Sequence, residues 1–76
     1  MNMKIGEFKD YALRTMTEEH LWKRGESDTF EIMGITYKIE MNDNGCFVLS
    51  VGNKETNFAT MGRLFGYLLR TFKIYY

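Results

Sequence analysis

Three short segments between residues 28 and 51 alternate apolar with polar residues, as β-strands do when one face is buried. They read DTFEIM, ITYKIEM and CFVLSV, and each is rich in β-branched and aromatic residues. Met33-Gly34 separates the first two, and Asn42-Asp43-Asn44-Gly45 separates the second from the third. Both connections have the composition of tight turns. The pattern therefore predicts a three-stranded antiparallel meander.

The second turn allows two registers, and the apolar pattern decides between them. A four-residue loop would pair Met41 with Cys46 and send Phe47 to the charged face. A type I turn with Gly45 as a left-handed bulge residue pairs Asn42 with Cys46 instead. A one-residue slip turns every side chain over, so we expect the second register. The apolar face then comprises Phe30, Ile32, Ile35, Tyr37, Ile39, Met41, Phe47, Leu49 and Val51.

A segment with helical periodicity precedes the meander, from residue 3 to about residue 24. Its apolar residues recur three and four positions apart, at Ile5, Phe8, Ala12 and Met16. Thr17-Glu18-Glu19 resembles a new helix start, so we expect a kink or break near residues 15–17. Trp22 lies on a flank of the stripe and is expected to cover the edge of the core, with partner contact as the alternative.

The strongest helical periodicity follows the meander. It consists of Phe58, Met61, Leu64, Phe65, Leu68, Leu69 and Phe72. We expect Asn53, Thr56 or Asn57 to cap this helix and Lys73 to end it. Both helices are needed to cover the apolar face of the sheet. The sequence thus predicts an α+β fold in one domain over residues 1–76. Its order is α-β-β-β-α, with a three-stranded antiparallel meander and both helices on one face.

Composition narrows the possible functions. The 76 residues include ten basic and ten acidic side chains, which argues against wholesale electrostatic binding to nucleic acid. The single Cys46 excludes an internal disulfide and fits a reducing compartment. No apolar run has membrane-spanning length, and the N-terminus lacks a signal-peptide pattern. We therefore expect a soluble, cytoplasmic protein.

The residues that carry chemistry are isolated from one another in the sequence. His20 and Cys46 are single copies, and no spacing pairs them as base and nucleophile or completes a metal site. Ser27 and Ser50 have no base at a recognisable spacing. A domain of this size rarely encloses several convergent polar groups. We therefore expect no enzyme activity, no catalytic residues, no metal and no cofactor.

The exposed line of the second predicted helix is the best candidate for a contact surface. Thr60, Arg63, Tyr67 and Arg70 are spaced to lie opposite its apolar stripe, and arginine and tyrosine often anchor interfaces. The alternative is a solvated face whose basic end suits a helix C-terminus. The predicted partner-binding residues are Arg63, Tyr67, Arg70, Lys73, Tyr75 and Tyr76. The other possible contact surface is the open sheet face around Glu31, Lys38 and Glu40.

Gly62 and Gly66 lie four residues apart within the same helix, where each glycine costs about 1 kcal/mol relative to alanine. Close packing against the first helix is the simpler explanation. Close packing against another chain is the functional alternative.

The predicted order of elements resembles the double-stranded-RNA-binding domain. That family uses a lysine cluster at the start of its last helix, whereas this chain has only Lys54 beside Glu55. The turn at Met33-Gly34 is also too short to reach a groove. The size of the chain, its lack of catalytic residues and the IMGITYKIEMNDNGCFVLSV meander followed by a helix resemble small phage-encoded inhibitors, including anti-CRISPR proteins.

These observations support three functional hypotheses. The first is a non-catalytic module that binds and blocks a host protein or ribonucleoprotein, as the resemblance to anti-CRISPR inhibitors implies. The second is a nucleic-acid-binding module that adds Lys23, Arg24 and Lys54 to the basic line. The third is a structural homodimer, formed through Gly62 and Gly66 or through the free edge of the first strand.

Overall fold

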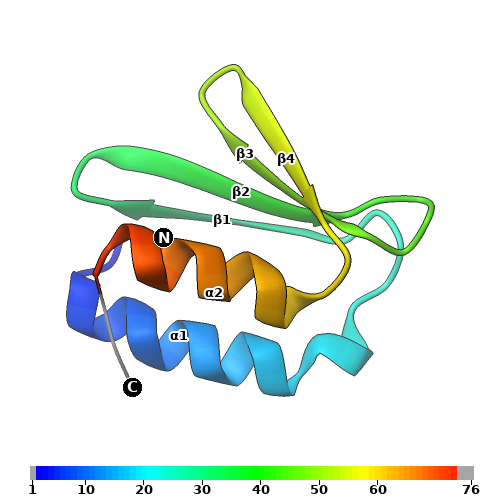
Figure 1. Ribbon diagram of the computed structural model, residues 1–76, viewed down its shortest axis with the longest axis horizontal. Coiled ribbons are helices and arrows are strands. Elements are labelled where there is room, and N and C mark those ends of the chain that lie inside the picture. Colours follow the sequence, from blue (N-terminus) through cyan, green and yellow to red (C-terminus); the bar gives the residue numbers. More distant parts are fainter. Residues whose placement is uncertain (1, 74–76) are drawn as a thin grey trace.

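A computed structural model describes residues 2–73 of the chain, and it consists of one antiparallel sheet with two helices on one side (Figure 1). The expected α+β class, with both helices on one face of a meander, is confirmed. The sheet has four strands in the order β1-β2-β3-β4, one more than expected. The elements are α1 (Ile5–Thr17), a 3-10 turn η1 (Glu19–Leu21), β1 (Ser27–Ile32), β2 (Ile35–Met41), β3 (Phe47–Val51), β4 (Lys54–Phe58) and α2 (Met61–Thr71).

The register predicted for the first three strands is confirmed. Met41 lies opposite Phe47, and the Asn42 amide donates to the Cys46 carbonyl over 2.8 Å. Gly45 has φ of 81°, the left-handed conformation that the bulge requires. The Asn42 side chain fixes the turn, because its Oδ1 accepts hydrogen bonds from the amides of Asn44 and Cys46. The apolar face expected for the meander is therefore the one that the helices cover, but Ile35, at the start of β2, is 46% exposed and lies outside the core.

The expected start of the second helix is wrong. Residues 54–58 form β4, so Phe58 belongs to a strand, and none of Asn53, Thr56 and Asn57 caps a helix. Gly52-Asn53 connects β3 to β4 as a two-residue hairpin loop in which Gly52 has φ of 61°. The N-cap of α2 is Thr60, whose Oγ1 accepts from the Arg63 amide over 3.1 Å.

The first helix is shorter than expected, and the predicted break is present. α1 ends at Thr17 and is followed by η1 rather than by a helix that continues to residue 24. Its buried face consists of Phe8, Tyr11, Ala12 and Thr15. Compared with the expected apolar stripe, this buried face is rotated around the helix toward Tyr11. Trp22 covers the core edge as expected, with its ring centroid 6.0 Å from that of Phe47.

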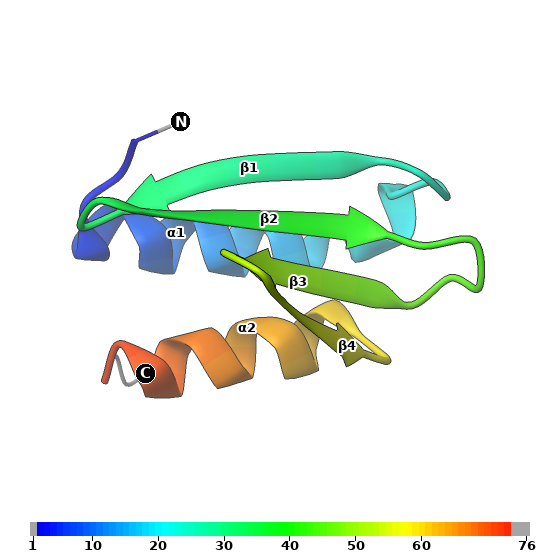
Figure 2. The same ribbon diagram turned by 90° about the horizontal axis from the view of Figure 1, so that it is seen from above.

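Aromatic side chains form much of the core between the sheet and the helices. The ring of Phe8 lies 5.6 Å from Phe30 and 5.9 Å from Phe65, so it touches both β1 and α2. Figure 2 shows α1 crossing beneath β1 and β2, whereas α2 lies on the side of β3 and β4. This arrangement leaves the outward side of α2 and the outer edge of β4 next to each other on the surface.

Two polar contacts fix the helices to the rest of the fold. The Tyr11 hydroxyl donates to Asp28 Oδ2 over 2.6 Å, which links α1 to β1. The Glu19 carboxylate accepts a hydrogen bond from the Met61 amide, so a side chain of η1 caps the N-terminus of α2. A carboxylate is favourable there because the helix dipole is positive at that end. These contacts set how α2 presents its outward side.

Candidate interaction surface on the second helix and the outer strand

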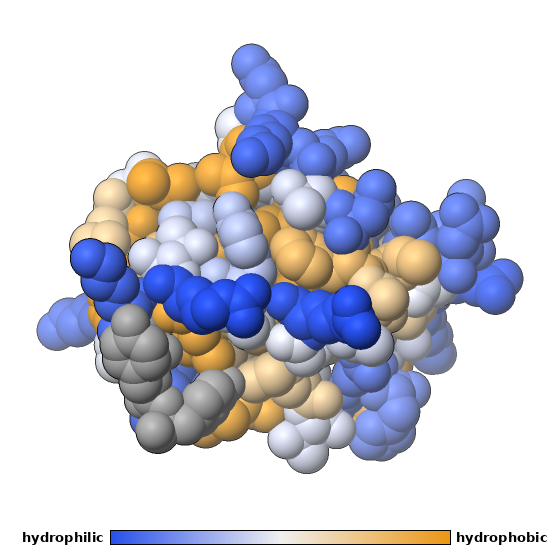
Figure 3. Space-filling model, viewed as in Figure 1, coloured by the Kyte–Doolittle hydropathy of each residue, from blue (hydrophilic) through white to orange (hydrophobic). Residues whose placement is uncertain are grey.

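The outward side of α2 carries the residues predicted to bind a partner. Arg63 and Arg70 are exposed, and Tyr67 keeps 39% of its surface in contact with solvent. Strongly hydrophilic side chains run across the middle of this face over α2, with hydrophobic surface above and below them (Figure 3). Tyr75 and Tyr76 lie outside the described residues. The exposure agrees with expectation, while the binding role stays a prediction.

The helix ends earlier than expected, at Thr71, and Lys73 follows it in a left-handed conformation with φ of 58°. Lys73 is exposed, and it lies beyond the end of the helix that carries Arg63 and Arg70. Those two arginines are the charged residues of α2, and the helix has no acidic residue. Its outward side is thus positively charged along its length.

A shallow groove of about 520 Å³ runs along the same side of α2. Its lining comprises Phe58, Thr60, Gly62, Arg63, Gly66 and Arg70. A Cβ added at Gly66 would meet nothing within 4 Å, and one at Gly62 would meet only Thr60 Oγ1 at 3.8 Å. The expectation that these glycines allow α1 and α2 to pack closely is therefore wrong. Within the described residues, nothing in the fold requires a glycine at either position.

A second, deeper pocket of about 230 Å³ opens between β4 and α2. Its apolar wall consists of Leu49, Val51 and Leu68, and its rim consists of Lys54, Thr56, Tyr67 and Thr71. Tyr37 also lines the pocket, and burial raises the pKa of its hydroxyl, with a smaller contribution from Tyr67. The cavity can therefore hold an apolar group and offer hydroxyl groups at its mouth.

The pocket exists because β4 is polar on the side that faces the helices. Thr56 lies opposite Leu49 and Lys54 lies opposite Val51, so both side chains are on the buried face of the sheet. Neither fills the space that a large apolar residue would occupy there. Phe58 is the large apolar residue that β4 places on this face, and its ring contacts Tyr67 at 5.6 Å. Polar residues at core-facing positions commonly mark functional sites.

Sequence reasoning missed the contribution of Lys54 and Thr56 because it assigned residues 53–57 to a helix cap. The dipeptide Gly52-Asn53 directly after a strand was the available signal, since Gly-Asn is typical of two-residue hairpin loops. The other sheet face, around Glu31, Lys38 and Glu40, is open and polar. There Lys38 Nζ lies 3.7 Å from Glu40 Oε1, an exposed ion pair that contributes little to stability.

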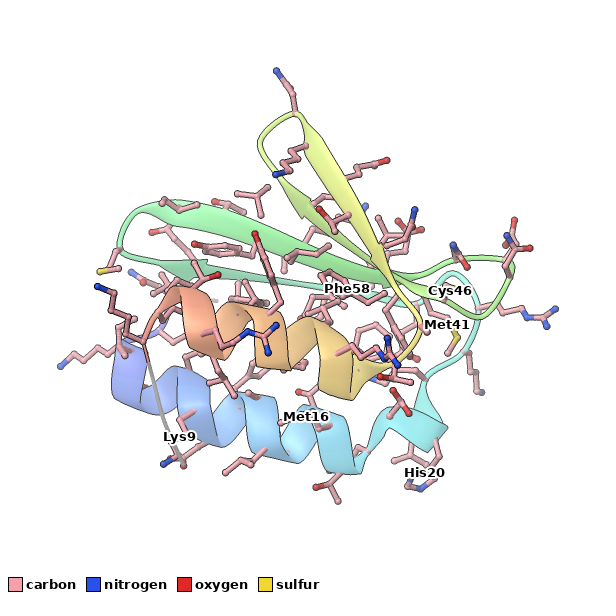
Figure 4. All side chains as sticks on the ribbon, in the orientation of Figure 1. Lys9, Met16, His20, Met41, Cys46 and Phe58 are labelled. Carbon is pink, nitrogen blue, oxygen red and sulfur yellow. The ribbon has the colours of Figure 1, made fainter. Side chains whose placement is uncertain are left out.

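The side chains that could act as a base or a nucleophile lie apart in the structure. His20 is in η1, in the helix layer, and Cys46 directly precedes β3, in the sheet layer (Figure 4). Among residues 2–73, no group of three histidine, cysteine, aspartate or glutamate side chains is placed to hold a metal ion. No helix in this part of the chain is long and apolar enough to cross a membrane.

Comparisons with models of known families, with curated proteins and with solved structures found no match to this chain. The fold itself separates the chain from the double-stranded-RNA-binding domain that the predicted order resembles. β4 stands between the third strand and the last helix, so the order is α-β-β-β-β-α.

Proposed function

We propose that this protein is a non-catalytic interaction module that binds a protein or ribonucleoprotein partner and blocks part of its surface. The contact surface is the outward side of α2, formed by Arg63, Tyr67 and Arg70. The observation that supports it is a groove beside these residues that includes two glycines with no packing role in the fold. Glycines in a helix lower its stability, so a role in close approach by another chain accounts for them.

The distribution of charge supports the same surface. The whole chain is neutral, but from Asn57 to Lys73 it has three basic residues and no acidic residue. Two of the three, Arg63 and Arg70, lie on the same groove. Tyrosine provides a large contact area at a low cost in conformational entropy, and the planar guanidinium of arginine is preorganised to pair with carboxylate and phosphate groups. Both residues are enriched among those that dominate binding energy. A complementary acidic or phosphate-bearing surface is therefore the expected partner chemistry.

Affinity capture from extracts of the source cell tests the proposal with two matched triple variants. One carries Arg63→Ala, Tyr67→Ala and Arg70→Ala on α2. The control carries Glu31→Ala, Lys38→Ala and Glu40→Ala on the open sheet face. Because truncating a single hot-spot side chain costs about 2 kcal/mol or more, the α2 variant should weaken the affinity for the partner by at least about thirtyfold. Loss with the sheet-face variant and retention with the α2 variant would move the site to the sheet.

The basic side of α2 also suits nucleic acid, and salt dependence separates the two cases. Binding to phosphates releases counterions, so affinity falls steeply as salt rises. Retention that survives physiological salt supports a protein partner. Direct binding to duplex RNA or DNA that disappears with the α2 variant would support the nucleic-acid hypothesis. A role as a phage inhibitor, which the resemblance to anti-CRISPR proteins implies, stays a prediction.

A further inference from the structure

The outer edge of the sheet at β4 is available for another strand. β4 is the last strand in the order and pairs only with β3. The opposite edge, at β1, is partly occupied, because the Met3 amide donates to the Glu31 carbonyl over 2.9 Å and Asn2 forms a parallel bridge there. An edge strand presents backbone N–H and C=O groups that an extended chain can pair with. Within the described residues, β4 has no such cover.

The pocket between β4 and α2 lies directly beside this edge. Lys54 and Thr56 line it from the strand, and Tyr67 and Thr71 line it from the helix. An added strand lies about 4.8 Å from β4, and its alternate side chains point to the helix side of the sheet. A side chain opposite Thr56 would therefore enter the pocket, where Leu49 and Leu68 provide an apolar wall. A volume of about 230 Å³ suits one large apolar side chain.

The positive charge on α2 indicates which type of residue the added strand would carry at its next position facing the helices. Phe58 is two residues beyond Thr56 and also lines the arginine groove on α2. A side chain opposite Phe58 would consequently point toward Arg63 and Arg70. These arginines have no acidic neighbour within α2, so a carboxylate at that position would be favourable.

We propose that β4 accepts an extended segment of a protein partner by strand addition. The segment places a large apolar residue in the β4–α2 pocket and an acidic residue, two positions away, against Arg63 and Arg70. This inference rests on the proposed function, since it specifies the chemistry of the partner bound beside α2. Main-chain hydrogen bonds supply affinity in this mode, and the two side chains supply selectivity.

The acetylated and amidated peptide Thr-Val-Glu-Thr-Phe-Val-Thr is the probe, because it places glutamate and phenylalanine two residues apart. Amide chemical shifts and hydrogen exchange of the full chain are followed by NMR during titration. We expect added protection of β4 amides and shifts at Thr56, Tyr67 and Arg63. Peptides with alanine in place of phenylalanine, or lysine in place of glutamate, should bind at least about tenfold more weakly.

Two protein variants complete the test. Thr56→Phe fills the pocket from within and should abolish peptide binding, while aromatic residues are well tolerated in strands. Asn57→Val adds an apolar residue to the same strand on the opposite face and should leave binding unchanged. Equal binding of all three peptides, peptide binding by the Thr56→Phe variant, or the absence of binding to the natural chain would overturn the proposal. β4 protection in the free protein, caused by a second copy, would also overturn it.

The outcomes for the two proposals are separable. If the peptide fails to bind but the α2 triple variant still loses its partner, only strand addition is wrong. If the α2 triple variant retains its partner, the proposed contact surface on α2 is wrong regardless of the peptide result.

Discussion

The hydrogen bond between Tyr11 and Asp28 provides a measurable test of how α1 is held on the sheet. Tyr11 is 5% exposed, and its hydroxyl donates to Asp28 Oδ2 over 2.6 Å. A hydrogen bond to a charged group contributes about 1.5–3 kcal/mol, and Asp28 is only half-buried, so the lower part of that range applies. Tyr11→Phe should therefore lower the free energy of unfolding by about 1.5–2 kcal/mol. The midpoint of thermal unfolding should fall by about 6–16 °C.

The same hydrogen bond should give stability a specific pH dependence. Burial raises the pKa of Tyr11 above its ordinary value of 10.0, and the hydrogen bond and charge of Asp28 raise it further. Above about pH 10 the unfolded chain releases the proton while the folded chain keeps it. Stability therefore falls as pH rises beyond that point, by about 1.4 kcal/mol at pH 11. The Tyr11→Phe variant lacks this contribution, so its deficit should shrink between pH 8 and pH 11.

Urea unfolding followed by circular dichroism measures both effects, and a double-mutant cycle with Asp28→Ala, which removes the acceptor, isolates the pair. We expect a coupling free energy of at least about 1 kcal/mol at pH 8. Tyr37, whose pKa is also raised, is present in every variant and cancels from the comparison. A deficit that stays constant from pH 8 to pH 11, or a coupling near zero, would refute the assigned role of this hydrogen bond.

Two glycine variants make further predictions. Gly45→Ala should cost about 1 kcal/mol or more in urea unfolding, because Gly45 has φ of 81° at the bulge that sets the register of β2 and β3; an unchanged midpoint would contradict this role. Gly66→Ala should raise the free energy of unfolding by about 0.5–1 kcal/mol, because the added Cβ meets nothing, and it should weaken partner capture by narrowing the groove. Destabilisation by Gly66→Ala would instead show that the fold needs this glycine.

The sequence alone determined the first three strands of the meander and their register. Alternation with period two puts Phe47 and Leu49 on one face, and Gly45 at the bulge is the turn geometry that keeps them there. These features are local, so the pattern of neighbouring residues contains the information. The apolar stripe from Met61 to Leu69 likewise predicted the second helix and which of its sides is exposed.

Tertiary structure decided the parts that depend on distant residues. Lys54-Glu55-Thr56-Asn57 has little intrinsic preference for a strand, and it becomes β4 because β3 provides a partner for its backbone. Thr60 caps the start of α2 locally, and the Glu19 carboxylate, which is far away in the chain, adds a second cap by accepting a hydrogen bond from the Met61 amide. The pocket beside β4 depends on the same pairing, since only a strand places Thr56 opposite Leu49 and leaves that space unfilled. Hydrophobic periodicity shows which side of a single segment is buried. This pocket depends on how β4 and α2 pack against each other, which the periodicity of either segment does not contain.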